Sequence, residues 1–114
     1  MLSNKTSILF SSDPDVAFVN EHGVTVGVIE IKGGADPAGA LERYGAAKKS
    51  FEAARRATPD VTTLLIASGM TSEALARIQQ DVLITACYDL AALLDEETIT
   101  YTAFMRQVFS LLGA

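Results

Sequence analysis

The sequence predicts an α/β fold in which a mixed β-sheet is flanked by helices. Residues 16–32 hold two apolar, β-branched runs around an Asn-Glu-His-Gly connection, which is typical of a β-hairpin. Further along, apolar runs alternate with helical patterns, which predicts the order β-β-β-α-β-α-β-α. The strands of a hairpin are antiparallel, whereas strands that follow helices usually run parallel to a neighbour, so the sheet should be mixed.

The composition indicates a single globular domain over residues 1–114. The chain is 49% hydrophobic and 20% charged, which supplies enough apolar material for a core and excludes a disordered chain. No apolar run approaches the ~18 residues that a membrane span needs. Cys87 is the only cysteine, which excludes an internal disulfide and predicts a reduced thiol in the core. We therefore expect a cytoplasmic protein without a membrane segment.

Three strands are expected in the first part of the chain. A first strand is predicted around Ile8–Phe10, before a turn that contains Pro14. The hairpin follows, with strands over Val16–Val19 and Val24–Lys32. His22 lies in the connecting turn, where we expect it to be exposed to solvent.

The hairpin brings charged side chains to one face of the sheet. We expect Val19 to pair with Val24. Side chains alternate between faces along a strand, so this register puts Asp15 on the same face as Glu30 and Lys32. Asp15 and Glu30 become diagonal neighbours with backbones about 7–8 Å apart. Two carboxylates that close together cost stability unless something occupies the site.

The second part of the chain is expected to alternate helices and buried strands. Asp36 can cap a helix that starts at Pro37 and ends near Ala57. The apolar stripe of that helix comprises Leu41, Tyr44, Ala47, Phe51 and Ala54. The remaining elements begin with a buried strand over 61–67 and a helix that Thr71 or Ser72 caps, which runs to about Gln80 and buries Leu75 and Ile78. A buried strand over 82–86, a short helix over 89–94 and a last helix capped near Thr98 are expected to follow.

The two carboxylates would suit Mg²⁺, which takes hard oxygen ligands and keeps several waters. Asp15, Glu30 and the backbone carbonyl of Ile31 are the candidate ligands, and Asp13 could replace Asp15. Lys32 could hold an attacking water or neutralise charge on a phosphate, as metal-assisted phosphodiester hydrolysis requires. The alternative is a plain ion pair between Glu30 and Lys32 near a strand end.

Pro14-Asp15, fourteen further residues and then Glu30-Ile31-Lys32 resemble the PD-(D/E)XK signature of the restriction-endonuclease-like nucleases. The continuation Gly33–Lys49 is similar, more narrowly, to type II restriction enzymes of the XcyI kind. The resemblance implies that Asp15 and Glu30 bind Mg²⁺, for which Mn²⁺ may substitute, and that Lys32 is the catalytic lysine. It also implies a restriction-endonuclease-like core, here without the usual first helix. Those enzymes are much longer chains, so this one resembles their catalytic part.

The charge distribution limits how tightly the chain could bind DNA. The net charge is −5, whereas DNA-binding proteins usually carry a basic surface. Arg43 and Lys48 are candidate contacts to DNA phosphate, Tyr44 is expected to pack, and Glu42 and Lys49 are expected to be solvent charges. The basic residues cluster on and after the proposed active strand, at Lys32, Arg43, Lys48, Lys49, Arg55 and Arg56.

Two classes of function follow. The first is a Mg²⁺-dependent DNA endonuclease similar to a type II restriction enzyme, which binds DNA weakly alone and works as a homodimer or with a DNA-binding partner chain. The second is a non-catalytic α/β interaction module, a decayed nuclease remnant that homodimerises. A divalent metal should raise the melting temperature of the first and leave that of the second unchanged.

Overall fold

The computed structural model describes residues 6–12, 14–34 and 37–113. Its sheet has five strands in the order β1-β2-β3-β4-β5. The first three strands are antiparallel, and β3, β4 and β5 are parallel, so the predicted mixed sheet is confirmed. The strands are β1 (Ser7–Phe10), β2 (Val16–Val19), β3 (Thr25–Lys32), β4 (Thr62–Ala67) and β5 (Ala86–Asp89).

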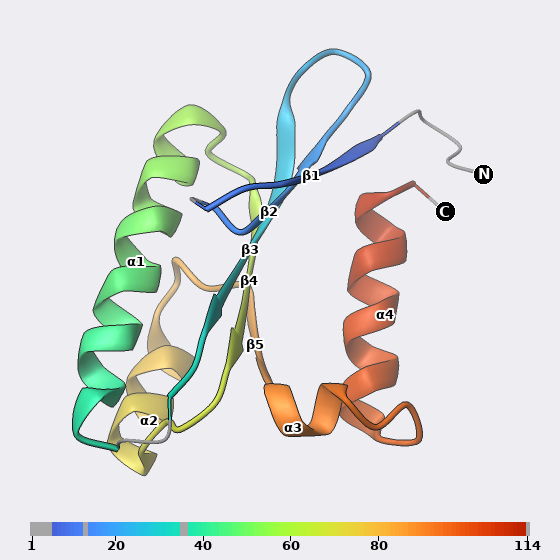
Figure 1. The fold of residues 1–114 in the computed structure, drawn as a ribbon. Helices are drawn as coiled ribbons and strands as arrows, with labels where there is room; N and C mark the ends of the chain where they lie inside the picture. The colour runs from blue at the N-terminus through green and yellow to red at the C-terminus, as the bar shows by residue number, and fades with distance from the viewer. Residues whose placement is uncertain (1–5, 13, 35–36, 114) are drawn as a thin grey trace.

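Helices cover both faces of this sheet, as the fold class requires. A short 3-10 turn over Pro37–Gly39 leads into α1 (Ala40–Ala57), which lies with α2 (Ser72–Gln80) on one face. The other face carries α3 (Leu90–Leu93) and α4 (Ile99–Leu111) (Figure 1). Within the described residues, none of these helices is both long enough and apolar enough to cross a membrane.

The sheet separates two apolar clusters. Towards α1, Phe51 packs on Val28 and Leu65, and towards α4, Leu111 packs with Phe18 and Leu64. The alternation of side chains along β3 explains the division, because Val28 and Glu30 face α1 while Ile29 faces α4. Glu30 is therefore a charged residue in the α1 layer of an otherwise apolar strand, with an exposed fraction of only 1%.

The register of the hairpin differs from the prediction by two residues. Asn20 donates its backbone N–H to the carbonyl of Val24, and the side chain of Asn20 accepts from the N–H of Val24, so the loop closes one position earlier than expected. A bulge then lets Val19 pair with Thr25 and Phe18 with Gly27. Each one-residue shift alone would reverse the faces of the side chains. The two shifts together move the register by two residues, so the predicted faces along the strand are kept.

The second parallel strand of the chain begins later than expected. Residues 82–85 form a turn, and β5 starts at Ala86, so the predicted strand over 82–86 is wrong. Asp81 is the cause, because its side chain accepts the N–H of Leu83 at 2.9 Å and its carbonyl accepts the N–H of Ile84 at 3.1 Å. This turn leaves Val82 87% exposed.

Smaller departures concern the helices. Leu41 and Leu75 were expected in the core, but each is 40% exposed, because α1 and α2 bury the preceding Ala40 and Ala74 instead; Ala47 and Ile78 are buried as predicted. Cys87 is half-buried. The N-cap of α1 is Gly39, and the predicted cap at Asp36 lies outside the described residues. The caps of α2 and α4 at Thr71 and Thr98 are confirmed, since each side chain accepts a backbone N–H.

Candidate active site

The three predicted catalytic residues lie together where β2 begins and β3 ends. Asp15 directly precedes β2, and Glu30 and Lys32 belong to the last part of β3. A tight turn holds the approach to Asp15: the hydroxyl of Ser11 donates to the carbonyl of Pro14 at 2.6 Å, and the Ser11 N–H donates to the Asp15 carbonyl at 3.1 Å. Asp15 and Lys32 both lie next to Glu30, as expected, while their action as one catalytic site remains a prediction.

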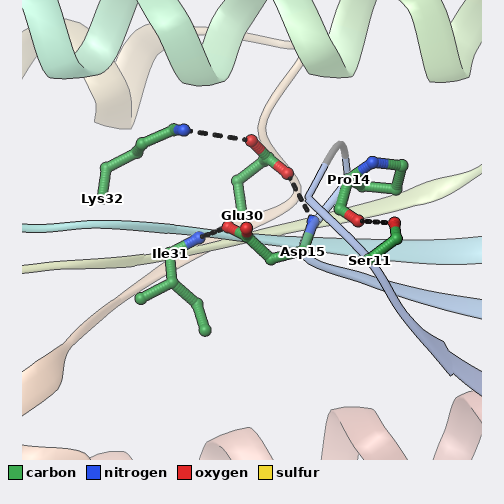
Figure 2. A network of polar contacts seen from close by, with 6 residues as sticks. All are labelled: Ser11, Pro14, Asp15, Glu30, Ile31 and Lys32. Carbon is green, nitrogen blue, oxygen red and sulfur yellow. Dashed lines mark hydrogen bonds and ion pairs between the residues drawn. The ribbon is translucent and has the colours of Figure 1, made fainter.

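Two crossed hydrogen bonds join Asp15 to β3 (Figure 2). The backbone N–H of Asp15 donates to Oε2 of Glu30 at 2.9 Å, and the N–H of Ile31 donates to Oδ2 of Asp15 at 2.7 Å. Continuing the observed register puts Asp15 directly opposite Glu30, not diagonal to it as predicted. Each carboxylate thus accepts a backbone N–H that a backbone carbonyl would accept if the pairing of β2 and β3 continued. The two acids are held side by side.

Figure 2 shows how the side chains divide around the sheet. Glu30 and Lys32 extend toward the α1 layer, the side chain of Ile31 extends the other way, and the Asp15 carboxylate lies at the level of the sheet. Lys32 places its ammonium 3.5 Å from Oε1 of Glu30. The Lys32 side chain keeps 28% of its surface exposed, so its amine remains within reach of a substrate.

The electrostatics of Glu30 are those of an incompletely neutralised acid. Burial raises the pKa of Glu30; the hydrogen bond from Asp15 N–H opposes this, while the nearby Asp15 charge raises it further. Lys32 lowers the pKa by its charge and its hydrogen bond, but the net direction is still upward. The ionised pair of acids is therefore short of positive charge, and a cation bound there would be stabilised.

A cavity of about 610 Å³ opens between this site and α1. Its sheet wall includes Glu30 and Lys32, and Ser12 and Pro14 line it at the turn before β2. Small residues form most of the α1 wall, which is why the helix does not fill the space. They are Ala46, Ser50, Ala53, Ala54 and Ala57. The volume lies in the range of pockets that hold ligands, roughly 300–1,000 Å³.

The donors at this site fit a small, hard cation. No three His, Cys, Asp or Glu side chains gather into a metal cluster in the part of the chain that the structure describes. Any ion here would therefore be held by two carboxylates, a backbone oxygen and water, a set that Mg²⁺ accepts. The N–H of Ile31 points at Asp15, and in an extended strand the carbonyl of the same residue leaves from the same edge. The Ile31 carbonyl thus lies on the Asp15 side of β3. Asp13 lies outside the described residues.

Arg43 and Lys48, the predicted phosphate contacts, are engaged with protein groups. Arg43 donates to the carbonyl of Gly69 at 2.5 Å, and Gly34 leaves room for its guanidinium, since a Cβ there would lie 2.8 Å from Nη1. Lys48 places its ammonium 3.6 Å from Oδ2 of Asp81. Contact of Arg43 or Lys48 with DNA remains a prediction.

Tyr44 packs as expected and also makes a polar contact that the sequence did not indicate. Its hydroxyl donates to Oδ2 of Asp81 at 2.5 Å. Burial and the neighbouring Asp81 raise the pKa of Tyr44 to about 12. Burial alone would raise the pKa of Asp81, but the bonds from Tyr44 and the Leu83 N–H, with Lys48, hold it below its usual range.

Lys49 is the residue that sequence reasoning overlooked. It is exposed, as expected of a solvent charge, yet it lines the cavity opposite β3. The spacing of small residues in the sequence could have indicated this position. Ala46 and Ala53 lie one turn before and after Lys49 on the same face of α1, and their short side chains leave that face open. His22, by contrast, is exposed as predicted and lies 3.8 Å from the carboxylate of Glu21.

The similarity of the chain to known proteins agrees with this geometry. A model of the XcyI restriction endonuclease family matches residues 2–114. No curated protein and no solved structure matches the chain. The family match extends well beyond the Pro14–Lys49 stretch on which the resemblance was based, and it confirms that resemblance.

Proposed function

Since the chain belongs to the XcyI restriction endonuclease family, we propose that it is a Mg²⁺-dependent DNA endonuclease that hydrolyses phosphodiester bonds. The observation that carries the proposal is the crossed pair of hydrogen bonds that holds Asp15 and Glu30 side by side, with Lys32 next to them and an open cavity in front. Asp15, Glu30 and the Ile31 carbonyl would hold the metal, and Mn²⁺ could substitute for it. When bound, Mg²⁺ would polarise the phosphoryl group as a Lewis acid.

Lys32 orients the water that attacks phosphorus. Its ammonium is anchored by Glu30 at 3.5 Å and retains further N–H donors, which can bind the oxygen of a water and of a phosphate. The new bond joins the water oxygen to phosphorus, while the bond from phosphorus to the 3′ oxygen breaks. The proton of the water leaves to solvent through the cavity, and the 3′ oxygen takes up a proton. The products are a 5′-phosphate and a 3′-hydroxyl.

DNA binding by the chain alone is expected to be weak. Affinity for DNA comes mainly from phosphate contacts that salt displaces, and the chain has a net charge of −5. A homodimer, or a partner chain with a DNA-binding surface, would provide the missing contacts and a second active site for the second strand. We therefore expect sequence-indifferent cleavage at low salt and little or none at ~150 mM salt without such a partner.

The test is plasmid nicking with Mg²⁺ or Mn²⁺ across a salt series, by the wild type and by Lys32→Ala. Lys32 lies at the end of a strand and contributes little to the core, so the variant should fold and should lose all turnover. Circular dichroism and the melting temperature would check the fold of the variant. Equal nicking by the two proteins would mean contamination and would contradict the proposal. Robust site-specific cutting would contradict the expectation of weak binding.

The second candidate, a non-catalytic module that homodimerises, is favoured by one observation. The edge strand β1 exposes three consecutive apolar side chains, with Ile8 at 39%, Leu9 at 51% and Phe10 at 79%. An exposed apolar edge is a usual site for pairing with another strand. Sedimentation of the wild type and of Phe10→Lys would detect a dimer that depends on this edge. A dimer together with no thermal response to Mg²⁺ or Mn²⁺ would favour the module over the nuclease.

A further inference from the structure

We propose that Lys49 binds a backbone phosphate of the strand that is cut, next to the phosphate at Lys32. This inference rests on the proposed nuclease function and adds a substrate contact to it. The cavity between β3 and α1 has two cationic side chains on its walls, Lys32 on the sheet and Lys49 on the helix. A DNA strand whose scissile phosphate lies at Lys32 would pass in front of α1 with its neighbouring phosphate near Lys49.

The contacts of the neighbouring basic residues distinguish Lys49 from them. Lys48 pairs with Asp81, and Arg43 donates to the Gly69 carbonyl, so both are used by the protein itself. Among the residues that the structure describes, the side chain of Lys49 has no hydrogen-bond or ion-pair partner. Lys49 thus lines a cavity with a charged amine that none of the described residues pairs with, which suits it to an external anion.

The wall around Lys49 also suits a nucleic-acid backbone. Ala46 and Ala53 flank Lys49 by one turn on either side, and their side chains are too short to cover the amine. The hydroxyl-bearing Ser12 and Ser50 line the same space, and such side chains commonly contact phosphate oxygens or sugars. A charged lysine on a small-residue wall can therefore reach a phosphate without displacing protein groups.

The predicted consequence is a change in binding, not in chemistry. One phosphate contact contributes about 0.9 to the slope of log K against log salt on duplex DNA. Lys49→Gln should lower the slope by that amount and weaken binding about five- to tenfold at ~0.1 M salt. In plasmid nicking it should raise KM and leave kcat unchanged, because Lys49 lies away from the attacking water. Lys49→Arg should restore both values to near those of the wild type.

The experiment measures fluorescence anisotropy of a labelled DNA duplex without divalent metal, so that no cleavage occurs, from about 20 to about 150 mM salt. The matched control is Arg106→Gln, which removes the same charge from an exposed residue of α4 on the opposite face of the sheet. We expect the control to keep the wild-type slope. Equal slopes for Lys49→Gln and Arg106→Gln would overturn the inference.

Other outcomes are also informative. If Lys49 instead neutralises Glu30 across the cavity, Lys49→Gln would lower the melting temperature without metal and leave the slope unchanged, which also overturns the inference. Failure of this inference and failure of the nuclease function are distinguishable. Nicking that Lys32→Ala abolishes supports the nuclease whatever the slope of Lys49→Gln, and absence of wild-type binding at the lowest salt would overturn both.

Discussion

Two carboxylates in this molecule have nearly the same surroundings at first sight. Glu30 lies 3.5 Å from Lys32, and Asp81 lies 3.6 Å from Lys48. Their side chains are 2% and 7% exposed. Yet the pKa of Glu30 is raised and that of Asp81 is lowered. A lysine at the same distance therefore does not decide the charge state of a buried acid; the other neighbours do.

The other neighbours of the two acids have opposite effects. The Asp81 carboxylate accepts the Tyr44 hydroxyl on Oδ2 and the Leu83 N–H on Oδ1, so both oxygens have a donor besides the lysine. Glu30 accepts one backbone N–H, from Asp15, and the same residue brings a second negative charge next to it. Burial disfavours the charged form of both acids, but the hydrogen bonds and the nearby lysine outweigh this effect only at Asp81.

The two acidic sites therefore differ in their role in the protein. Asp81 joins α1 to the turn before β5, and its satisfied charge stabilises the fold. Their described neighbours do not fully compensate the charges of Glu30 and Asp15, and in the proposed function a bound cation would complete the compensation. Acids whose pKa is perturbed by burial and by a like charge in a cavity are candidates for functional sites. The predictions that follow separate the two pairs by activity, stability, metal response and pH.

The largest expected effect is the loss of activity in Glu30→Gln. The amide keeps an oxygen that can accept the Asp15 N–H, but it removes one of the two proposed carboxylate ligands. We expect the rate of plasmid nicking to fall by at least about 100-fold, the scale of losing a principal electrostatic group. The folded state should survive, and without metal its stability should rise by about 1 kcal/mol, since a buried charge next to Asp15 is removed.

Asp81→Ala is the matched change at the other pair, and it should do the reverse. Loss of the carboxylate leaves the Tyr44 hydroxyl and the Leu83 N–H without their acceptor, which costs about 2–3 kcal/mol. Urea denaturation should show this loss, while nicking measured well below the melting temperature stays within a few-fold of the wild type. If both variants lost stability and kept activity, the distinction between the two pairs would be wrong.

The metal response should be the next largest difference. A site with tenfold more free Mg²⁺ than its Kd gains about 1.4 kcal/mol, which raises the melting temperature of a domain this size by several degrees. Asp15→Asn should abolish the rise, whereas Asp81→Asn should keep it from a lower starting temperature. Thermal denaturation with and without Mg²⁺ measures both. A rise that persists in Asp15→Asn would place the metal elsewhere.

The smallest effect is a pH dependence of opposite sign at the two acids. The folded-state pKa of Asp81 is lowered, so its contribution to stability is present above the unfolded pKa and is lost as pH falls through the folded value. The folded-state pKa of Glu30 is raised, so its contribution is present below the unfolded pKa and is lost as pH rises through the folded value.

Urea denaturation without metal from about pH 2 to pH 8 would measure both contributions, because the Asp81 contribution changes below its ordinary pKa of 3.8 and the Glu30 contribution changes above its ordinary pKa of 4.5. The stability difference between wild type and Asp81→Asn should grow with pH, with the wild type favoured. The difference between wild type and Glu30→Gln should also grow with pH, but with the variant favoured. Parallel curves for wild type and either variant would contradict the pKa shift of that acid.

The sequence by itself determined most of the elements and the place in the fold of the proposed catalytic residues. Period-two alternation in residues 16–32 predicted Asp15, Glu30 and Lys32 on one face. This holds for Glu30 and Lys32 although the register was off by two, whereas the Asp15 carboxylate turns to the edge of β3 and accepts the Ile31 N–H. The sequence also predicted the helix over 40–57 and the caps at Thr71 and Thr98. Each of these features depends on residues only a few positions apart along the chain.

Only the tertiary structure decided the register, the start of β5 and the side of α1 that faces the cavity. The bulge between Phe18 and Val19 shifts the register, and the turn at Asp81 interrupts an apolar run through local hydrogen bonds; no periodicity encodes either. Lys48 and Lys49 are equivalent in sequence, but they point about 100° apart around the helix. One meets Asp81 and the other meets open space, because which side of a helix is covered depends on contacts between distant parts of the chain.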